Sequence, residues 1–354
     1  MRVEAATAEA TPSPKSNTNR PFWHEGLAPF TRPSLGLSVL DLATSVVPFI
    51  AGWIGMYLAL ENVGYWLALC LALPTAGFLL RTFIVFHDCT HGSFMPTKRG
   101  NHIVGVITGL LVFTPFARWR HQHAVHHASA GDLERRGVGD VQTITLSEYR
   151  AMSGKGRLAY RLFRNPLVMF TIGPIYSMVV MPRIVPKGER PRIRNSVILT
   201  NIALAVLLTG MCFLVGPFTF FILEGPVILL AGIAGVWLFY VQHQFEDVYW
   251  ESSDQWSYAD AALRGSSYLK LPKVLQWFSG NIGLHHVHHL SARVPNYHLQ
   301  RAHDGNEIFA DVPVLTLWEG LRCVRFKVID DDSGRLLTWA EVRQMNAAAP
   351  APAS

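Results

Sequence analysis

Charge is scarce in this sequence of 354 residues. Aspartate, glutamate, lysine and arginine make up 16% of it, against about a quarter in an ordinary soluble protein, while half of the residues are hydrophobic. Charge is absent from four long runs, namely residues 42–60, 63–80, 196–223 and 225–244. Each run is near or above the roughly 18 residues that a membrane-spanning helix needs. The composition therefore predicts an all-α integral membrane protein and argues against a soluble globular protein.

Cysteine is also scarce. Cys70, Cys89, Cys212 and Cys323 are scattered, without a Cys-x-x-Cys pair, so we expect neither a disulfide framework nor a cysteine-based metal site. The N-terminus lacks the pattern of a cleavable signal peptide, and membrane targeting is expected to depend on the first span.

Histidine is the residue type that forms patterns. Eight of the 15 histidines fall in three short clusters, which are His87 and His91; His123, His126 and His127; and His285, His288 and His289. Positions i, i+3 and i+4 share one face of a helix, so the rings of each cluster can converge on one volume. Imidazole is the commonest metal ligand, and the H-x-x-H-H pattern occurs twice. The clusters therefore predict metal binding.

The number of histidines predicts two metal ions. A structural zinc takes four protein ligands and a catalytic zinc three, so eight imidazoles exceed the need of one ion. His243, at the end of the fourth run, is a ninth candidate ligand. Four further histidines lie outside the repeated pattern and are left unassigned: His121, His286, His298 and His303.

The apolar runs also predict the organisation of the chain. We expect a flexible tail over residues 1–32, a membrane domain over 33–346 and a C-terminal tail over 347–354. Spans are expected at about 36–60, 63–86, 196–216 and 225–244, with cytosolic regions over 87–195 and 245–346. Turns near Glu61–Gly64 and across Gly216–Pro226 would make two hairpins. The apolar stretches 103–117 and 166–182 are short, and we expect a re-entrant or interfacial position for them.

The positive residues predict the orientation. Of the 31 lysines and arginines, four precede the first span, seventeen lie between Arg81 and Arg194, and ten follow the fourth span. The two short turns on the opposite face contain none. By the positive-inside rule, both termini and all three histidine clusters are expected on the cytoplasmic side of a bacterial inner membrane. The basic face also suits anionic headgroups or an acidic protein partner.

Ligand type alone does not choose the metal, since imidazole suits zinc, copper, iron and nickel. The H-E-x-x-H motif of zinc proteases and the Glu-x-x-His motif of soluble di-iron bundles are both absent. A site at the end of apolar hairpins suits a membrane-embedded substrate, whose unactivated C–H bonds favour iron. The rival from another class, a metal transporter or sensor, predicts charged residues along the spans. Apart from Arg81, near one end, we find none in the predicted spans.

The clusters and their flanks resemble a known family. The patterns His87-Asp-Cys-Thr-His91, His123-Ala-Val-His126-His127 and His285-His-Val-His288-His289 resemble the three histidine boxes of membrane fatty acid desaturases. The stretches 132–140, 265–272 and 290–297 resemble its bacterial acyl-lipid branch, and the similarity extends from about residue 35 to 325. The resemblance implies four transmembrane helices in two hairpins and a cytosolic helical cap with a histidine-only di-iron site. It also implies an O₂-dependent enzyme that inserts a cis double bond into an acyl chain.

The resemblance further implies ligands, partners and alternatives. The implied iron ligands are His87, His91, His123, His126, His127, His285, His288 and His289, with His243 matching an extra histidine after the last span. No fused cytochrome domain is visible, so electrons are expected from a separate ferredoxin or cytochrome. Hydroxylases and ketolases share the boxes and remain the alternative within this metal class.

Several polar and aromatic residues near the clusters are candidates for supporting roles. Those that could orient the rings of the ligands are Asp88, Asp140, Glu246, Asp247 and Asn281. Ordinary surface polarity explains each of them equally well. Trp119 and Trp256 are expected either to line a substrate tunnel or to lie at the membrane interface.

Overall fold

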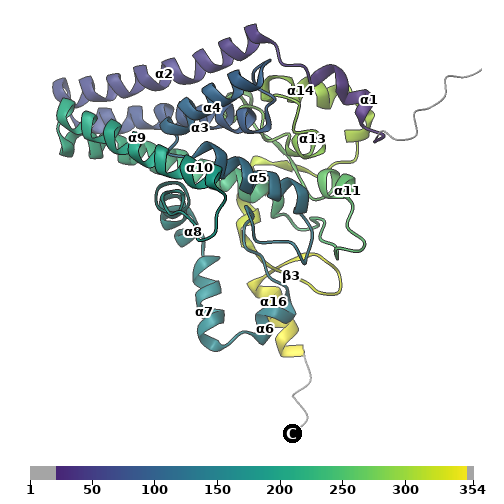
Figure 1. The fold of residues 1–354 in the computed structure, drawn as a ribbon. Helices are drawn as coiled ribbons and strands as arrows, with labels where there is room; N and C mark the ends of the chain where they lie inside the picture. Colours follow the sequence, from purple (N-terminus) through teal and green to yellow (C-terminus); the bar gives the residue numbers. More distant parts are fainter. Residues whose placement is uncertain (1–20, 349–354) are drawn as a thin grey trace, which may run out of the picture.

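Four long helices dominate the computed structural model, which describes residues 21–348. They are α2 (Leu35–Asn62), α3 (Tyr65–His91), α9 (Pro191–Val215) and α10 (Pro217–His243). Figure 1 shows them side by side on the left, with the shorter helices and strands gathered at one end. Within the described residues, these four helices are long and apolar enough to cross a membrane. The prediction of a mostly helical protein with four membrane-length helices is confirmed.

Helix α3 is the centre of the membrane part. In the most apolar 18-residue stretch of α3, 56% is buried inside the protein. The corresponding share for α9 is 11%. Ala68, Ala72 and Ala76 repeat every four residues on its buried face and allow close packing of neighbouring helices. The helix ends at Gly92, whose left-handed φ of +72° suits glycine. It therefore continues past the predicted end at residue 86, and the first histidine cluster lies on its last turns.

The second hairpin differs from its predicted form. A turn at Gly216 (φ +85°) joins α9 to α10, and Pro217 occupies the first position of α10. The predicted turn at Glu224–Pro226 lies inside α10, because a membrane helix tolerates an internal proline. Glu224 is buried in the bundle and accepts a hydrogen bond from Trp53 Nε1 at 2.9 Å. The fourth span thus begins near residue 217 instead of 225.

A sharply bent helix pair separates the first two histidine clusters. Helix α4 (Lys98–Leu111) and α5 (Phe116–Ser129) meet at 101°. The two helices touch closely, since a Cβ at Gly105 would lie 2.2 Å from the Phe116 ring and one at Gly109 would lie 2.7 Å from the Thr114 carbonyl oxygen. The clusters at either end of this pair lie together, as described below. The bent pair therefore begins and ends at the same end of the bundle, and its re-entrant position stays a prediction.

A second bent pair lies against α10. Helix α7 (Gly154–Phe163) makes an angle of 70° with the segment 166–183, which comprises α8 (Pro166–Pro174), the π-helix η2 (Ile175–Val180) and the turn η3 (Met181–Arg183). A Cβ at Gly232 of α10 would lie 2.8 Å from Pro174, so the two elements are in close contact. Leu167 and Ile172 remain exposed on the other side. The segment therefore has one side packed on α10, and its interfacial position stays a prediction.

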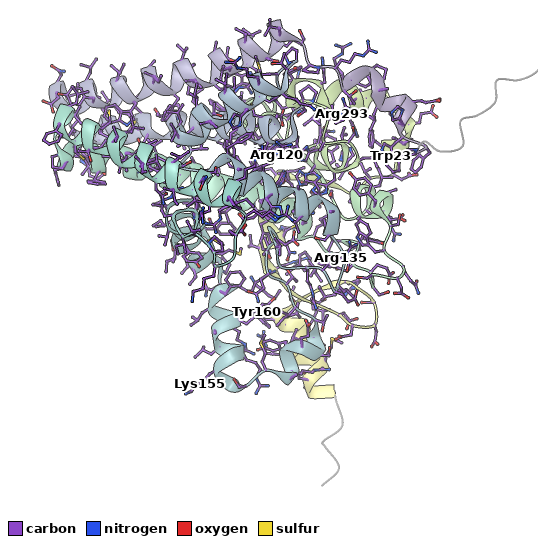
Figure 2. All side chains as sticks on the ribbon, viewed as in Figure 1. Trp23, Arg120, Arg135, Lys155, Tyr160 and Arg293 are labelled. Carbon is purple, nitrogen blue, oxygen red and sulfur yellow. The ribbon has the colours of Figure 1, made fainter. Side chains whose placement is uncertain are left out.

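The cap is built from short elements. They are α6 (Leu146–Ala151), α11 (Tyr258–Leu263), β1 (Tyr268–Lys270), α12 (Lys273–Phe278), α13 (His285–Leu290), α14 (Asn296–Asp304), η4 (Glu307–Phe309), β2 (Val314–Thr316), α15 (Leu317–Arg322), η5 (Cys323–Arg325), β3 (Phe326–Ile329), β4 (Leu336–Thr338) and α16 (Trp339–Ala348). Strands β1 and β2 pair in parallel, and β3 and β4 antiparallel. Figure 2 places the labelled Arg120, Arg135, Lys155 and Arg293 away from the far ends of the long helices. These four basic residues therefore lie at the cap end.

The ends of the chain correct the predicted tails. Residues 24–30 form α1 (His24–Leu27) and η1 (Ala28–Phe30), and Leu27 is buried in the hydrophobic core of the cap. Residues 21–32 are thus folded against the cap, where burial of an apolar side chain stabilises them. Helix α16 likewise continues two residues past the predicted boundary at 346. The rest of the two predicted tails, 1–20 and 349–354, lies outside the described residues.

Candidate metal centre

Four helices bring the predicted ligands together at the junction of bundle and cap. The first cluster lies on the last turns of α3, and the second on α5 beyond the bend. His243 is the last residue of α10, and the third cluster forms α13. The main-chain N–H of Leu269 donates to the Gly283 carbonyl, which fixes the segment before α13 to strand β1. Each cluster therefore lies on a helix whose position the rest of the fold determines.

The nine predicted histidines form two groups. The five-histidine group contains His87, His91, His123, His127 and His288, and the four-histidine group contains His126, His243, His285 and His289. Each residue offers one nitrogen, and the nitrogens of a group all lie within 4.8 Å of one another. The helical spacing explains the division, because His123 and His127 on α5 face one group while His126 faces the other. The histidine clusters can thus hold metal ions.

The inward nitrogens are spaced as ligands of a common ion would be. In the five-histidine group, His123 Nε2 lies 3.0 Å from His87 Nε2 and 3.1 Å from His127 Nε2. In the four-histidine group, His243 Nε2 lies 3.1 Å from His126 Nε2 and 3.0 Å from His285 Nε2. Two ligands at right angles, each about 2.1 Å from an ion, are about 3.0 Å apart. The observed Nε2–Nε2 separations of 3.0 to 3.1 Å match this distance.

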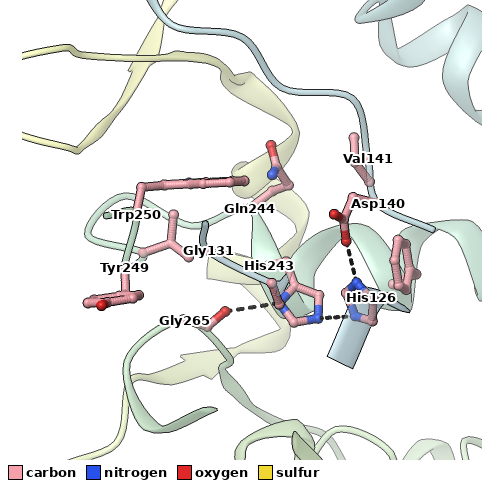
Figure 3. A pocket seen from close by; sticks show the side chains of 12 residues that line it. His126, Gly131, Asp140, Val141, His243, Gln244, Tyr249, Trp250 and Gly265 are labelled. Atoms are coloured by element: carbon pink, nitrogen blue, oxygen red, sulfur yellow. Dashed lines mark hydrogen bonds and ion pairs between the residues drawn. The ribbon is translucent and has the colours of Figure 1, made fainter. Parts of the chain in front are cut away.

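The outward nitrogens of three rings have oxygen partners. His87 Nδ1 lies 2.9 Å from Asp88 Oδ1, and His126 Nδ1 contacts Asp140 Oδ1. His243 Nδ1 donates to the Gly265 carbonyl oxygen at 2.9 Å, as Figure 3 shows beside the Asp140 contact. An oxygen partner holds the proton on Nδ1 and leaves the Nε2 lone pair free for a metal. Asp88 and Asp140, two of the residues that the sequence suggested for orienting the rings, therefore contact the Nδ1 atoms of predicted ligands.

Burial favours neutral imidazole in both groups. Burial, with neighbouring imidazoles as a lesser cause, lowers the pKa of His285, His288 and His289 well below its usual range. A neutral ring keeps the lone pair that metal binding requires. His91 Nε2 and His289 Nε2 are buried without a hydrogen-bond partner in the described residues. Buried polar atoms of this kind need an explanation, and a bound metal supplies one.

Other candidates lie away from the histidines. Glu246 faces Arg335 at 3.6 Å on the surface, and Asp247 is exposed. Asn281 donates to the Asn296 carbonyl oxygen instead of to a histidine. Trp256 donates to the Ala130 carbonyl oxygen beside Arg135 on the cap. Glu246, Asp247 and Asn281 are thus polar residues of the cap, which was the alternative interpretation of the sequence, and Trp256 lies on the cap beside Arg135.

Trp119 lies at the edge of the five-histidine group. Its ring stacks on His123 with centroids 4.2 Å apart and meets His87 edge-on at 5.5 Å. Phe83 and Phe86 of α3 pack on its other sides. Trp119 thus lies between the histidines and the phenylalanines of α3.

Some supporting residues had no visible signal in the sequence. Asn296 and Asp41 extend the contacts of Asp88, and the Gly265 carbonyl holds His243. A main-chain carbonyl carries no side-chain signature. Asn296 is 208 residues from Asp88 along the chain, so only the folded structure shows the contact.

The unassigned histidines are not part of either group. His121 is exposed on α5. His286 Nε2 lies 2.9 Å from His303 Nδ1, and both rings pack against Phe309. His298 packs on Tyr297. The spacing of the boxes therefore separates the residues that converge from those that do not.

A cleft adjoins the four-histidine group. It encloses about 320 Å³, part of it open to solvent, and its wall includes His126, Asp140, His243 and Trp250. Figure 3 shows the labelled side chains around it. The cleft therefore lies directly beside two ligands of the four-histidine group.

Comparison with known proteins agrees with the geometry. The sequence profile described as "Fatty acid desaturase" matches residues 63–317. The chain is 44% identical over 324 residues to the "Fatty acid desaturase" of Bacillus subtilis (strain 168), covering 92% of each chain. It is 28% identical over 245 residues to the "sn-1 oleoyl-lipid 12-desaturase" of a Synechocystis strain, covering 65% of each chain. It is also 27% identical over 281 residues to the "sn-1 acyl-lipid omega-3 desaturase (ferredoxin)" of that strain, covering 76% of this chain and 73% of the relative. On these grounds the chain belongs to the fatty acid desaturase family and is an oxidoreductase.

Proposed function

We propose that the protein inserts a cis double bond into the acyl chain of a membrane lipid, using O₂ and a centre of two iron ions. The observation that carries this proposal is the pair of adjacent buried histidine groups at the ends of the spans. The proposed ligands are the nine histidines of these groups. Family membership supports the desaturase activity, and the Synechocystis relatives support a lipid-linked acyl substrate.

The residues fit two metal ions. The donor set consists of imidazoles, Nε2 atoms stand about 3 Å apart, and two buried Nε2 atoms have no other partner. Bound iron would supply the activation of O₂ that removes hydrogen from an unactivated methylene. Forming the alkene removes two hydrogen atoms, and with two electrons and two protons these reduce O₂ to two molecules of water.

The chain's own residues contribute position and environment. Asp88 and Asp140 hold two rings with Nε2 directed inward. Trp119 and its phenylalanine neighbours keep water from the side facing the bundle. Identical methylenes differ only in how far they reach past the reacting point, so selectivity depends on how the acyl chain is held.

An apolar cavity supports an acyl substrate. It lies between α3, the bend after α4, the π-helix and α10, and its empty volume of about 220 Å³ includes space open to solvent. Its lining consists of Leu79, Val112, Phe113, Met178, Val179 and Ile228. We propose that this space receives methylenes of the acyl chain, because a wall of hydrocarbon side chains favours them over any polar ligand.

We further propose that a separate ferredoxin or cytochrome supplies the electrons, and that the site faces the cytoplasm of a bacterial inner membrane. The name of one Synechocystis relative includes ferredoxin, and the cleft gives a water-exposed approach to the four-histidine group. The positive residues support the orientation. Reporter fusions after Gly64 and Gly216 should be external, and fusions after Gly139 and at the C-terminus internal. An external Gly139 would contradict a single site at one membrane face.

Fatty acid profiling tests the activity most directly. The protein is expressed in a host without this activity, and membrane lipids are analysed by mass spectrometry. An added double bond is expected, whereas an added oxygen would indicate the hydroxylase or ketolase alternative. The transporter alternative predicts no new lipid. Metal analysis of purified active protein should give two irons per chain, and one zinc without iron would contradict the proposed centre.

A further inference from the structure

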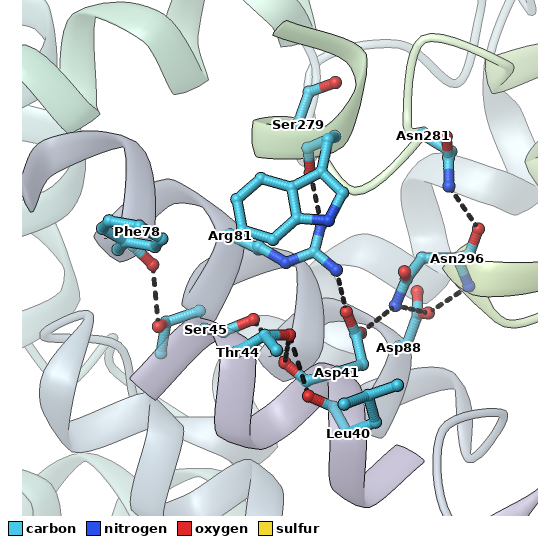
Figure 4. A network of polar contacts seen from close by, with 12 residues as sticks. Leu40, Asp41, Thr44, Ser45, Phe78, Arg81, Asp88, Ser279, Asn281 and Asn296 are labelled. Atoms are coloured by element: carbon cyan, nitrogen blue, oxygen red, sulfur yellow. Dashed lines mark hydrogen bonds and ion pairs between the residues drawn. The ribbon is translucent and has the colours of Figure 1, made fainter. Parts of the chain in front are cut away.

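A buried polar network ties the first hairpin to the cap beside the five-histidine group. Figure 4 shows its members, which come from three separate helices. Asp41 of α2 pairs with Arg81 of α3, Asn296 begins α14, and Asp88 precedes the end of α3. Asp41 is 5% exposed, Arg81 7%, and Asp88 and Asn296 1% each, so water satisfies none of them fully.

Asn296 connects the two carboxylates. Its Nδ2 donates to Asp41 Oδ2 at 2.9 Å and to Asp88 Oδ2 at 3.1 Å. Its main-chain N–H also donates to Asp88 Oδ2, at 2.6 Å. An amide nitrogen has two hydrogens, so one Asn296 side chain can serve both carboxylates, which would otherwise repel each other. Aspartate at this position would supply no donor and a third negative charge.

The network reaches His87 through Asp88. With Oδ2 occupied by Asn296, Asp88 Oδ1 remains for His87 Nδ1 at 2.9 Å. The opposite atom of that ring, Nε2, points to His123 Nε2 in the five-histidine group. A fixed carboxylate keeps the proton on Nδ1, sets the plane of the ring and strengthens Nε2 as a ligand.

If the Arg81–Asp41 ion pair served only the fold, it would not need the further contacts through Asn296 to Asp88. Arg81 pairs with Asp41, donates to the Trp277 carbonyl oxygen and stacks on the Trp277 ring at 4.1 Å. Those contacts alone would join α2, α3 and the cap. Burying a second carboxylate is costly unless its hydrogen bonds are satisfied, and burial of charge in membrane helices commonly accompanies function.

We infer that Asn296 and Asp41 are positioning residues for the metal ligand His87, acting through Asp88. The inference rests on the proposed function, since it assumes an ion at the five-histidine group. It assigns Arg81 the task of holding Asp41 in place. The Asp41–Asn296–Asp88 chain thus gives the five-histidine group a support that begins in the first span.

The test compares Asn296→Ala and Asp41→Asn with Glu224→Gln. Glu224 is likewise buried in the spans, but its bond goes to Trp53, so Glu224→Gln replaces a buried carboxyl group without touching the network. Each full-length protein is purified with iron, and loss of iron to a chelator and thermal unfolding are measured. We expect both network variants to lose one of two irons about tenfold or more faster than the wild type. Glu224→Gln should release iron at the wild-type rate.

The outcomes separate the two proposals. A wild-type chain that binds fewer than two irons would contradict the proposed centre itself. If the wild type holds two irons and both network variants release them at its rate, the positioning role is overturned while the centre stands. Loss of both irons in step with a lower unfolding temperature would also overturn it, as would failure of both variants to accumulate while Glu224→Gln does. If only one network variant accumulates, its selective loss of one iron decides the question.

Discussion

The two histidine groups contain the same type of residue but differ in number, support and surroundings. The five-histidine group draws on α3, α5 and α13, and its His87 is held by a carboxylate network that continues into the first span. The four-histidine group draws on α5, α10 and α13, and a carboxylate and a main-chain carbonyl hold its rings. It also adjoins the cleft. Both groups are largely buried, so they differ in the number of imidazoles and in the residues that support them.

The difference has a chemical consequence. An ion in the four-histidine group has one imidazole fewer, so more of its coordination sphere is free for a non-protein ligand. The residues behind the groups differ in charge as well. Asp88 and Asp41 lie behind the first group, whereas Gln244, next to His243, accepts a hydrogen bond from the buried Arg164 at 2.8 Å. Four predictions test this asymmetry.

Removing a ligand from the four-histidine group should have the largest effect. His126→Ala or His243→Ala leaves three imidazoles there, and we expect activity to fall at least 100-fold with loss of about one iron per chain. Membrane insertion should persist, because the spans drive it. Lipid profiling and metal analysis check this, with His121→Ala as the control, since His121 is exposed on the same helix as His126. If His243→Ala and His121→Ala both kept full iron, His243 would not be a ligand.

Removing a ligand from the five-histidine group should affect metal binding less. His91→Ala leaves four imidazoles, the number that the other group has when intact. We therefore expect this variant to retain more iron than His126→Ala, although the altered site should still lose activity. Iron content after identical purification measures the difference. Equal iron loss in the two variants would show that ligand number does not distinguish the groups.

Changing the partner of a ligand should have an intermediate effect. Asp140→Asn preserves shape but removes the negative charge beside His126 Nδ1, and a loss of roughly 10- to 100-fold in metal affinity is typical of such changes. Asp247→Asn is the matched control, because Asp247 is exposed and contacts neither group. Competition with a chelator measures the affinity. Unchanged affinity in Asp140→Asn would mean that the four-histidine group does not depend on its carboxylate.

The sequence predicted which histidines converge, because their spacing along each helix is a local feature of the chain. The i, i+3, i+4 spacing places His123 and His127 on one side of α5, and the apolar runs place α3 and α10 where they deliver His87 and His243. The sequence did not show how the nine histidines divide into a group of five and a group of four. Which ring joins which group depends on how α5 is rotated relative to α3 and α13, and that rotation follows from packing across distant segments.

The failures have a common cause in long-range contacts. Glycine and proline at residues 225 and 226 suggested a turn, but the bundle keeps α10 helical and buries Glu224 against Trp53. The spans also contain Asp41 and Glu224, which our comparison with transporters overlooked by counting only Arg81. Asp41 is neutralised by a partner 40 residues away. Pairing of this kind is visible only once the helices are placed.

The smallest expected effect concerns the buried cations behind the four-histidine group. Lys327 donates to the main-chain oxygens of Arg164, at 2.7 Å, and of Val324, and it is 4% exposed. Burial, and then the positive charge of Arg164, lowers the pKa of Lys327 to about 8. In the unfolded chain a lysine has a pKa of about 10.4. Between these values the unfolded chain holds a proton that the folded chain has released, so folding stability rises with pH across this window.

Lys327→Met should remove that pH dependence. Below pH 8 the wild type holds a buried positive charge that the variant lacks, so the variant should gain most in relative stability there. The advantage should shrink as the pH rises towards 10, by at most about 3 kcal/mol from the size of the pKa change. Loss of the two hydrogen bonds adds an offset that does not vary with pH. Thermal unfolding of both proteins at pH 7 and pH 10 measures the change, and iron content should be equal throughout. A stability difference that is the same at both pH values would show that folding does not lower the pKa of Lys327. A loss of iron would show that the buried cations affect the four-histidine group as well as the fold.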